Sequence, residues 1–305
     1  MSAKQTRVLI FGAGVVGSIY TIQFIKAGID VTMFARSNRL QALQEKGLQY
    51  SEKGVRKSIN VKVIGTLAND DIYDFIFVPV RYDQAESALL ALKDNQSKHI
   101  VTMTNSSIGF SAWQDIVGDR LLPAFPGFGG QIKDGILYAR IPPKFLAGTM
   151  FGEANGLETE RTKNLVKLLE AANLPHRINN NMKEFLITHS ISDIAMTGVL
   201  VQDDQIIDKK VLVSRETAQK ISATLKTYLR AIQKAGITIN PSFFKVVLKC
   251  PNFILNAFFM LWLRSGMVKD MLSPDFAGAA NRENRQLQKD LLKFLSQNGV
   301  IANQR

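Results

Sequence analysis

The sequence predicts an α/β domain built on a parallel sheet, followed by an all-helical domain. Its 305 residues are enough for about two domains. The first half alternates short apolar runs with helical patterns, as βαβ units do. Beyond residues 179–181 helical periodicity continues with little strand pattern. We therefore expect the first domain to span residues 1–178 and the helical domain residues 179–305.

In the first half, the expected strands are short apolar runs. They cover residues 7–11, 31–34, 61–64, 75–80 and 100–103. Helical spacing predicts helices over residues 16–27, 83–92 and 159–172. Residues 136–141 and 145–151 flank Pro142–Pro143 and are expected to pair as antiparallel strands. In the second half, we expect helices over residues 182–201, 214–235, 242–265 and 280–297. Pro251 should break the third of these, because proline lacks the backbone N–H that the helix needs.

Composition and charge narrow the classes of partner and cofactor that we expect for this protein. The chain is 46% hydrophobic and 21% charged, as ordinary folded proteins are. Its net charge of +12 favours an anionic partner. The basic residues are scattered, so we expect no nucleic-acid partner.

No apolar run approaches the roughly 18 residues of a membrane span. With no export signal and the single Cys250, we expect a cytoplasmic protein. The three histidines lack metal-ligand spacing, so we expect no metal site.

The strongest motif is a glycine pattern directly after the first expected strand. Gly12 suits a tight turn, Gly14 allows close approach of a pyrophosphate, and Gly17 lets helix and strand pack closely. Val15 and Val16 lie in the first turn of the following helix, where backbone N–H groups face phosphates. This strand–glycine–helix order predicts a Rossmann-type dinucleotide site.

The end of the second expected strand distinguishes NADP from NAD. NAD-binding proteins usually carry an acidic residue there that binds the ribose hydroxyls. Here Asp30 stands at the opposite end of the strand, and Arg36 follows its carboxyl end, with Ser37, Asn38 and Arg39 after it. Arginine binds a 2′-phosphate well because its planar guanidinium matches the phosphate oxygens. We therefore expect NADP(H), held by Arg36 and assisted by its neighbours.

Several motifs, taken in order, make the chain resemble the ketopantoate reductase (2-dehydropantoate 2-reductase) family. They are the glycine pattern of residues 12–17, the Ala35–Arg36 step, residues 40–48, Val80–Arg81, Asn105 and residues 148–153. The resemblance implies hydride transfer from NADPH to a 2-keto acid, as in the conversion of ketopantoate to pantoate in pantothenate biosynthesis. It also implies that Arg81 binds the cofactor or a carboxylate and that Asn105 closes over the nicotinamide or the substrate carbonyl.

The sequence departs from the family where the proton donor should be. The family places a lysine on the first helix of the second domain, and the best register puts Phe185 in that position. His189 and Asp193 then occupy the positions of two asparagines, at helical spacing that puts Phe185, His189 and Asp193 on one face. The resemblance implies that Asp193 contacts the substrate. Lys183 lies two residues before Phe185. Either His189 is the acid, or Lys183 swings in, or the acid is lost. In the last case the chain is an NADPH-binding sensor or interaction module.

The resemblance also gives Glu283 a role. It matches the glutamate that holds the substrate hydroxyl, although an ion pair with Arg282 or Arg285 is an alternative. The nearby positive charge favours a small anionic carbonyl substrate. Residues 126–130, rich in glycine, are either a lid or a turn. The apolar residues 257–263 are expected in the core, with a homodimer contact as the second interpretation and a membrane contact as the last.

Overall fold

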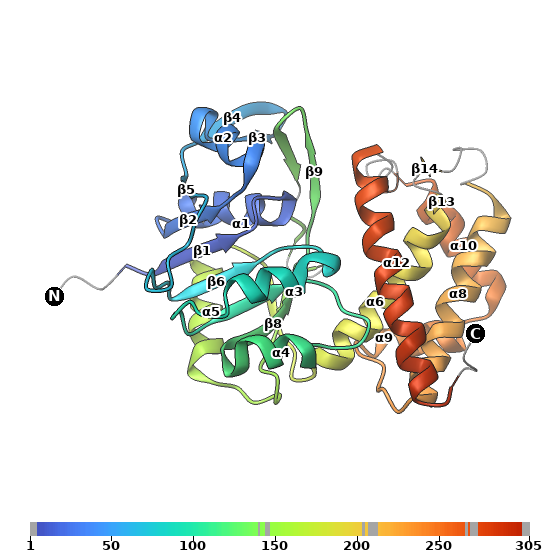
Figure 1. Ribbon diagram of the computed structural model, residues 1–305. Coiled ribbons are helices and arrows are strands. Elements are labelled where there is room, and N and C mark those ends of the chain that lie inside the picture. The colour runs from blue at the N-terminus through green and yellow to red at the C-terminus, as the bar shows by residue number, and fades with distance from the viewer. Residues whose placement is uncertain are drawn as a thin grey trace. The chain divides into compact units, whose positions relative to one another are not determined.

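The computed structural model describes residues 5–139, 141–143, 147–202, 205–206, 213–265, 268 and 274–300 (Figure 1). Its backbone divides into two compact units. The first comprises residues 1–104 and 110–182, and the second comprises residues 105–109 and 183–305. The short segment 105–109 thus interrupts the first unit in sequence but packs within the second.

The first unit is built on an eight-stranded sheet. Its strand order is β12-β11-β8-β7-β6-β1-β2-β5, and every neighbouring pair is parallel except β8 with β11. The strands β1, β2, β6 and β7 are almost wholly buried and apolar, as parallel strands covered on both faces are. The bounds are β1 Arg7–Phe11, β2 Asp30–Phe34, β5 Lys62–Ile64, β6 Phe75–Val78, β7 Ile100–Met103, β8 Leu121–Phe125, β11 Thr149–Phe151 and β12 His176–Ile178.

The helices of this unit confirm the expected βαβ pattern. They are α1 Val15–Lys26, α2 Ser37–Lys46, α3 Tyr82–Ala91, α4 Ser111–Val117 with a short 3₁₀ turn at Gly118–Arg120, and α5 Glu160–Ala171. The helix α5 begins with a capping box, in which the Thr159 side chain accepts a hydrogen bond from the Thr162 backbone N–H. Such a cap satisfies backbone donors that the first turn leaves unpaired.

The expected antiparallel pairing of residues 136–141 with 145–151 is wrong. The strand β10 (Ile136–Ala139) pairs instead with β9 (Gly130–Lys133) and β3 (Leu48–Glu52), in a second sheet that ends in β4 (Val55–Ile59). Residues 145–146, at the start of the second expected strand, lie outside the described residues. The strand β11 pairs with β8 and β12.

Local turn chemistry explains this pairing. The connection between β9 and β10 is Asp134–Gly135, and both residues have positive φ, at 51° and 77°. The connection between β3 and β4 is Lys53–Gly54, at 51° and 81°. Two successive positive φ angles are typical of type I′ hairpin turns, which close a hairpin between adjacent strands. The Asp-Gly pair therefore gives β10 a partner that precedes it in sequence.

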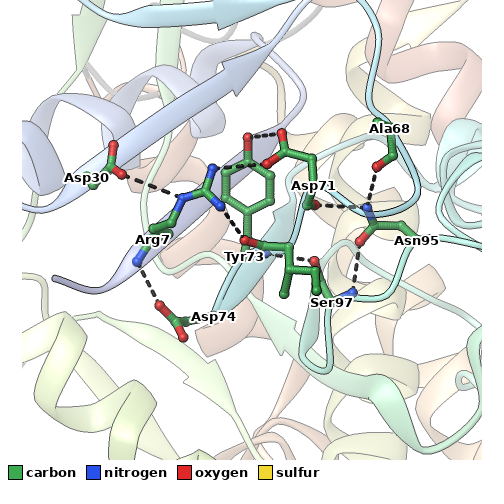
Figure 2. A network of polar contacts seen from close by, with 9 residues as sticks. Arg7, Asp30, Ala68, Asp71, Tyr73, Asp74, Asn95 and Ser97 are labelled. Carbon is green, nitrogen blue, oxygen red and sulfur yellow. Dashed lines mark hydrogen bonds and ion pairs between the residues drawn. The ribbon is translucent and has the colours of Figure 1, made fainter. Parts of the chain in front are cut away.

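A polar network connects residues at the amino-terminal ends of the sheet strands, opposite the end that carries the glycine loop (Figure 2). Arg7, the first residue of β1, donates to Asp71 Oδ1 at 3.0 Å and stacks on the Tyr73 ring at 4.6 Å. Asn95 donates to the Ala68 and Asp71 carbonyl oxygens. Burial acts to raise the pKa of Asp71, but hydrogen bonds from Tyr73 and Arg7 outweigh it and lower that pKa. The network fixes the loops beneath the sheet.

The second unit is helical, as expected. Pro251 separates α9 from α10, which confirms the predicted break. The helix α12 begins six residues before the expected start, and a short β13–β14 pair was not expected. No described helix is both long and apolar enough to cross a membrane. The bounds are α6 Met182–Leu200, β13 Val201–Gln202, β14 Gln205–Ile206, α8 Arg215–Lys234, α9 Phe243–Lys249, α10 Asn252–Leu263 and α12 Pro274–Gln297.

The expected burial of residues 257–263 is only partly correct. The helix α10 packs against α8 and buries one face, formed by Leu255, Phe259 and Leu263 at intervals of four residues. Phe258 and Leu261 lie on the other side and are exposed. A helix that contacts the core on one side can bury only one stripe, whatever its composition.

Candidate functional site

The glycine loop joins β1 to α1, and its backbone geometry explains why glycine is required at positions 12 and 17. Gly12 has φ of 146°, a conformation that side-chain-bearing residues rarely adopt. A Cβ atom on Gly17 would lie 1.9 Å from the Gly12 carbonyl oxygen, so only glycine fits where α1 packs on the loop. Gly14, the N-cap of α1, has an ordinary φ of −80°. A Cβ atom on Gly14 would meet no atom within 4 Å. Gly14 therefore faces open space.

The first turn of α1 keeps its positive end available to an anion. Val15 and Val16 open the helix, and no acidic residue lies in its first turn. Among the described residues no side chain caps it. In contrast, the caps of α5 and α8 accept hydrogen bonds at Thr159 and Ser214, and each of these helices carries a glutamate in its first turn. The uncapped N–H groups and the helix dipole suit a phosphate group.

The carboxyl end of β2 supplies two arginines with different surroundings. Arg36 is exposed, and its guanidinium carbon lies 5.3 Å from the centre of the Phe34 ring, which stacks on Phe11. Arg39 Nε donates to the Ala13 carbonyl oxygen at 3.1 Å, and Nη2 donates to Ser18 Oγ at 3.3 Å. Burial lowers the pKa of Arg39. Arg39 therefore ties α2 to the glycine loop, whereas Arg36 lies at the surface beside it.

The end of β6 lies next to the same loop. A Cβ atom on Gly12 would be 3.3 Å from the Pro79 carbonyl oxygen and from Val80 Cγ1. Thr104, just after β7, donates to the Val80 carbonyl oxygen at 2.7 Å. Arg81 donates to both carboxylate oxygens of Asp83, at 2.9 and 3.0 Å. Arg81 thus has a defined position close to the edge of the sheet that carries the glycine loop.

A cluster in the helical unit brings together three residues that the sequence singles out. Asn105 Nδ2 donates to Asp193 Oδ2 at 2.6 Å, and the same oxygen lies 3.5 Å from His189 Nδ1. Asn105 is buried, and its Oδ1 accepts a hydrogen bond from the Ser106 backbone N–H at 3.0 Å. The cluster therefore brings Asn105 together with residues 84 and 88 positions further along the chain. Hydrogen bonds at Nδ2 and at Oδ1 orient the amide of Asn105.

Phe185, which occupies the position of the family's lysine, and Lys183, the alternative proton donor, differ in their surroundings. Phe185 is buried, and its ring centre lies 5.8 Å from that of His189. Phe185 has no proton to donate, so it packs beside the imidazole. Lys183 is exposed, and a Cβ atom on Gly109 would lie 3.0 Å from Lys183 Cγ. Gly109 has φ of 84°. The segment 105–109 therefore contacts both Lys183 and the His189 cluster.

Glu283 on α12 is half-buried between two buried asparagines, Asn281 and Asn284. A Cβ atom on Gly198 would lie 3.2 Å from Asn284 Nδ2, so Gly198 makes room for this side chain on α6. The Asn284 Oδ1 is buried without a hydrogen-bond partner among the described residues. Sequence reasoning missed both asparagines, although their spacing of three residues on one helix face was visible. Within the described chain, no group of three His, Cys, Asp or Glu residues is placed to hold a metal.

The fold and its glycine loop define the class of this protein. It has a parallel α/β sheet domain of the Rossmann type, followed by an all-helical region. Residues 8–134 match the family described as Ketopantoate reductase PanE/ApbA. The expected resemblance to this family and the expected fold class are thereby confirmed.

Solved structures share the fold over nearly the whole chain. A probable 2-dehydropantoate 2-reductase from Bacillus subtilis is 16% identical, with a TM-score of 0.68, covering 97% of this chain and 95% of its own. D-mandelate dehydrogenase with NADH and anilino(oxo)acetate is 15% identical, with a TM-score of 0.67, covering 96% and 98%. The 2-dehydropantoate 2-reductase from Geobacter metallireducens is 16% identical, with a TM-score of 0.64, covering 95% and 99%. No curated protein sequence matches the chain.

Proposed function

We propose that this protein is an NADPH-dependent reductase that transfers hydride to the carbonyl carbon of a 2-keto acid or a related carbonyl compound. The observation that carries the proposal is the Asn105–Asp193–His189 cluster. Asn105 follows Thr104, whose hydroxyl is bonded at the carboxyl edge of the sheet. In open α/β sheets, ligands bind at that edge. Because Thr104 and Asn105 are consecutive residues, one peptide bond connects the sheet edge that carries the glycine loop to the cluster.

The cofactor half of the proposal rests on the loop and on Arg36. The open space at Gly14 and the uncapped turn of α1 fit a pyrophosphate. We assign Arg36, which is exposed at the carboxyl end of β2, to bind the 2′-phosphate. Arg39 supports this assignment by holding the loop in shape. We assign Arg81 to the same site as a cofactor contact. When bound, NADPH supplies the hydride.

The chemistry requires a proton donor next to the carbonyl oxygen. Negative charge builds on that oxygen as hydride reaches the carbon, and a donor within hydrogen-bond reach stabilises it. We assign this role to His189. Its Nδ1 faces Asp193 at 3.5 Å, so Nε2 is the nitrogen that would deliver the proton. We assign Asp193, whose carboxylate lies beside Nδ1, to position the ring, and Asn105 to position Asp193 through the hydrogen bond from Nδ2.

Two alternatives rest on specific observations. Lys183 lies against Gly109, in the segment that also carries Asn105, and is the alternative acid. Phe185 packs beside His189 in the position where the family has lysine. This replacement supports the second candidate function, an NADPH-binding sensor or interaction module without turnover.

The substrate part of the proposal is a small anionic carbonyl compound. We assign Glu283 as the acceptor for the substrate hydroxyl, because a half-buried carboxylate between two buried asparagines can accept such a bond. Ketopantoate is the first compound to test. A role in pantothenate biosynthesis and a cytoplasmic location belong to the same proposal, since both rest on the family.

Turnover tests the function directly. The full-length protein is mixed with NADPH and, separately, with ketopantoate and a panel of other 2-keto acids, while NADPH absorbance is followed. NADPH binding is measured by fluorescence in the same samples. We expect NADPH to be oxidised with at least one 2-keto acid. Tight binding without oxidation across the panel would contradict the reductase and favour the sensor.

Arg36→Ala should reduce affinity for NADPH and leave affinity for NADH unchanged. Charge-assisted hydrogen bonds are worth about 1.5–3 kcal/mol, so the dissociation constant for NADPH should rise roughly 10- to 100-fold. Titration of both cofactors by fluorescence checks this expectation. Lys167→Ala, on the exposed side of α5, removes the same charge elsewhere and should change neither constant. Equal losses for NADPH and NADH in the Arg36 variant would contradict the assignment.

A further inference from the structure

The segment 105–109 contains a serine whose hydroxyl group bonds to the backbone of the same segment. Ser106 is fully buried. Its Oγ donates a hydrogen bond to the Gly109 carbonyl oxygen and accepts one from the Ile108 backbone N–H at 3.4 Å. Serine side chains commonly bond to backbone groups a few positions away in this manner. One hydroxyl group therefore holds together the two ends of the stretch 106–109.

The backbone at the end of this stretch has a conformation that glycine adopts easily. Gly109 has φ of 84°, which lies in the left-handed region. Gly109 is also buried, and a buried carbonyl oxygen needs a hydrogen-bond partner. The Ser106 hydroxyl supplies that partner. Removing the hydroxyl group would therefore leave the Gly109 carbonyl oxygen without this bond and release the closed stretch.

The backbone of the same serine orients the amide of Asn105. The Ser106 N–H donates to Asn105 Oδ1 at 3.0 Å, and Asn105 Nδ2 donates to Asp193 Oδ2 at 2.6 Å. A backbone N–H can only donate, so it fixes which end of the amide carries the oxygen. Because the Ser106 hydroxyl holds the backbone of 106–109, it acts on Asp193 through Asn105. Asp193 Oδ2 in turn lies 3.5 Å from His189 Nδ1.

The closed stretch also forms the surface against which Lys183 lies. A Cβ atom on Gly109 would be 3.0 Å from Lys183 Cγ, so the backbone of Gly109 is close to the lysine side chain. The bond from Ser106 Oγ holds the Gly109 carbonyl group in place. His189 and Lys183, the two candidates for the proton donor, therefore both lie next to parts of the chain that this hydroxyl group holds.

The neighbouring serine provides a natural comparison. Ser107 is also fully buried, but its Oγ has no hydrogen-bond partner among the described residues. Most buried hydroxyl groups do have a partner. Truncating Ser107 to alanine thus breaks no hydrogen bond that the described part of the chain makes through this side chain. Ser106 and Ser107 are alike in residue type and burial, and they differ in whether the hydroxyl group is bonded.

We propose that Ser106 is a positioning residue of the candidate site. Its hydroxyl group keeps the stretch 106–109 closed, and the closed stretch keeps Asn105 Nδ2 directed at Asp193. The effect on turnover rests on the proposed reductase function, whereas the effect on Asn105 does not. A displacement of about 1 Å in a catalytic arrangement can cost roughly 100-fold in rate. Binding of NADPH, which is assigned to the glycine loop, should not depend on this hydroxyl group.

Kinetics of two matched variants of the full chain test the effect on turnover. We expect Ser106→Ala to lower kcat with the best 2-keto acid roughly 10- to 100-fold. The dissociation constant for NADPH should stay unchanged, and KM should change less than kcat. Ser107→Ala should leave all three constants unchanged, because its hydroxyl group makes no bond in the described part of the chain. Circular dichroism establishes that both variants fold.

Hydrogen exchange of the Asn105 side-chain amide, followed by NMR, tests the positioning without any substrate. The resonances of Nδ2 are identified by their loss in Asn105→Asp. In Ser106→Ala these protons should exchange roughly 10-fold faster than in the wild type, as weakening of one hydrogen bond implies. Backbone amides of α8, which report opening of the whole helical unit, should keep their rates. Ser107→Ala should match the wild type at both places.

A second pair of variants covers the case in which Ser106→Ala does not fold. Ser106→Cys nearly keeps the shape of the side chain and retains a weak donor. Its effects should lie between those of the wild type and Ser106→Ala, and Ser107→Cys is its control.

Equal kcat, or equal exchange of the Asn105 amide, in the Ser106 and Ser107 variants would overturn the proposal. If the wild type turns over no 2-keto acid, the reductase function fails, and the exchange measurement alone then decides the role of Ser106.

Discussion

Gly14→Ala is expected to weaken NADPH binding roughly 10- to 100-fold while leaving the fold intact. The added Cβ meets no protein atom within 4 Å, and φ at this position is −80°, so alanine fits without strain. Lost N-cap preference and gained chain stiffness should keep the free energy of unfolding within about 1 kcal/mol of the wild type. The methyl group would instead occupy the space assigned to the pyrophosphate. Fluorescence titration and urea unfolding measure the two effects separately.

Gly17→Ala is the matched control. Its Cβ would lie 1.9 Å from the Gly12 carbonyl oxygen, so the loop must move or α1 must shift. Overpacking of this kind costs about 1–3 kcal/mol of unfolding free energy, occasionally more. This variant should therefore lose both stability and binding, whereas Gly14→Ala loses binding alone. Unchanged NADPH affinity in a folded Gly14→Ala variant would place the cofactor elsewhere.

His189→Ala is expected to lower kcat roughly 10²- to 10⁴-fold, the usual contribution of a general acid. The dissociation constant for NADPH should stay unchanged, because His189 lies in the helical unit and the cofactor is assigned to the glycine loop. Asp193→Asn and Asn105→Ala should lower kcat by smaller factors, since they act through the orientation of the imidazole. Steady-state kinetics with the best 2-keto acid checks all three.

Lys183→Met decides between the two acids. The lysine is exposed, so the substitution should not disturb folding, and kcat should change little if His189 is the acid. A large loss of kcat in Lys183→Met, with nearly normal turnover in His189→Ala, would transfer the role to Lys183. The contact between Lys183 and Gly109 would then be the relevant geometry.

The sequence predicts the parallel sheet and the helical domain well, because buried apolar strands and amphipathic helices carry strong local patterns. The glycine loop was also predictable, since Gly12 and Gly17 have steric tasks that no other residue performs. The predicted pairing of β10 is wrong because the Asp134–Gly135 turn, and not Pro142–Pro143, closes the hairpin that contains this strand. Apolar composition alone also misled the prediction for α10, since burial depends on which side faces α8.

The candidate site was only partly predictable. Helical spacing places His189 and Asp193 on one face, but nothing in the local pattern announces that Asn105 bonds to Asp193. That contact joins residues 88 positions apart, and such pairings are set by tertiary packing. Arg39 is expected from the sequence to assist Arg36 at a phosphate, and the structure adds that its guanidinium bonds to Ala13 and Ser18. A charged side chain near a loop can hydrogen-bond to that loop as readily as it can extend toward a ligand.

Isotope transfer tests the central claim most directly. NADPH carrying deuterium at either C4 position of the nicotinamide is incubated with the protein and its best 2-keto acid, and the product is examined by mass spectrometry and NMR. The account predicts that one of the two labelled cofactors gives a 2-hydroxy acid with deuterium at C2, and that His189→Ala slows this transfer. Absence of deuterium at C2 from both labelled cofactors, with NADPH bound, would contradict hydride transfer by this protein.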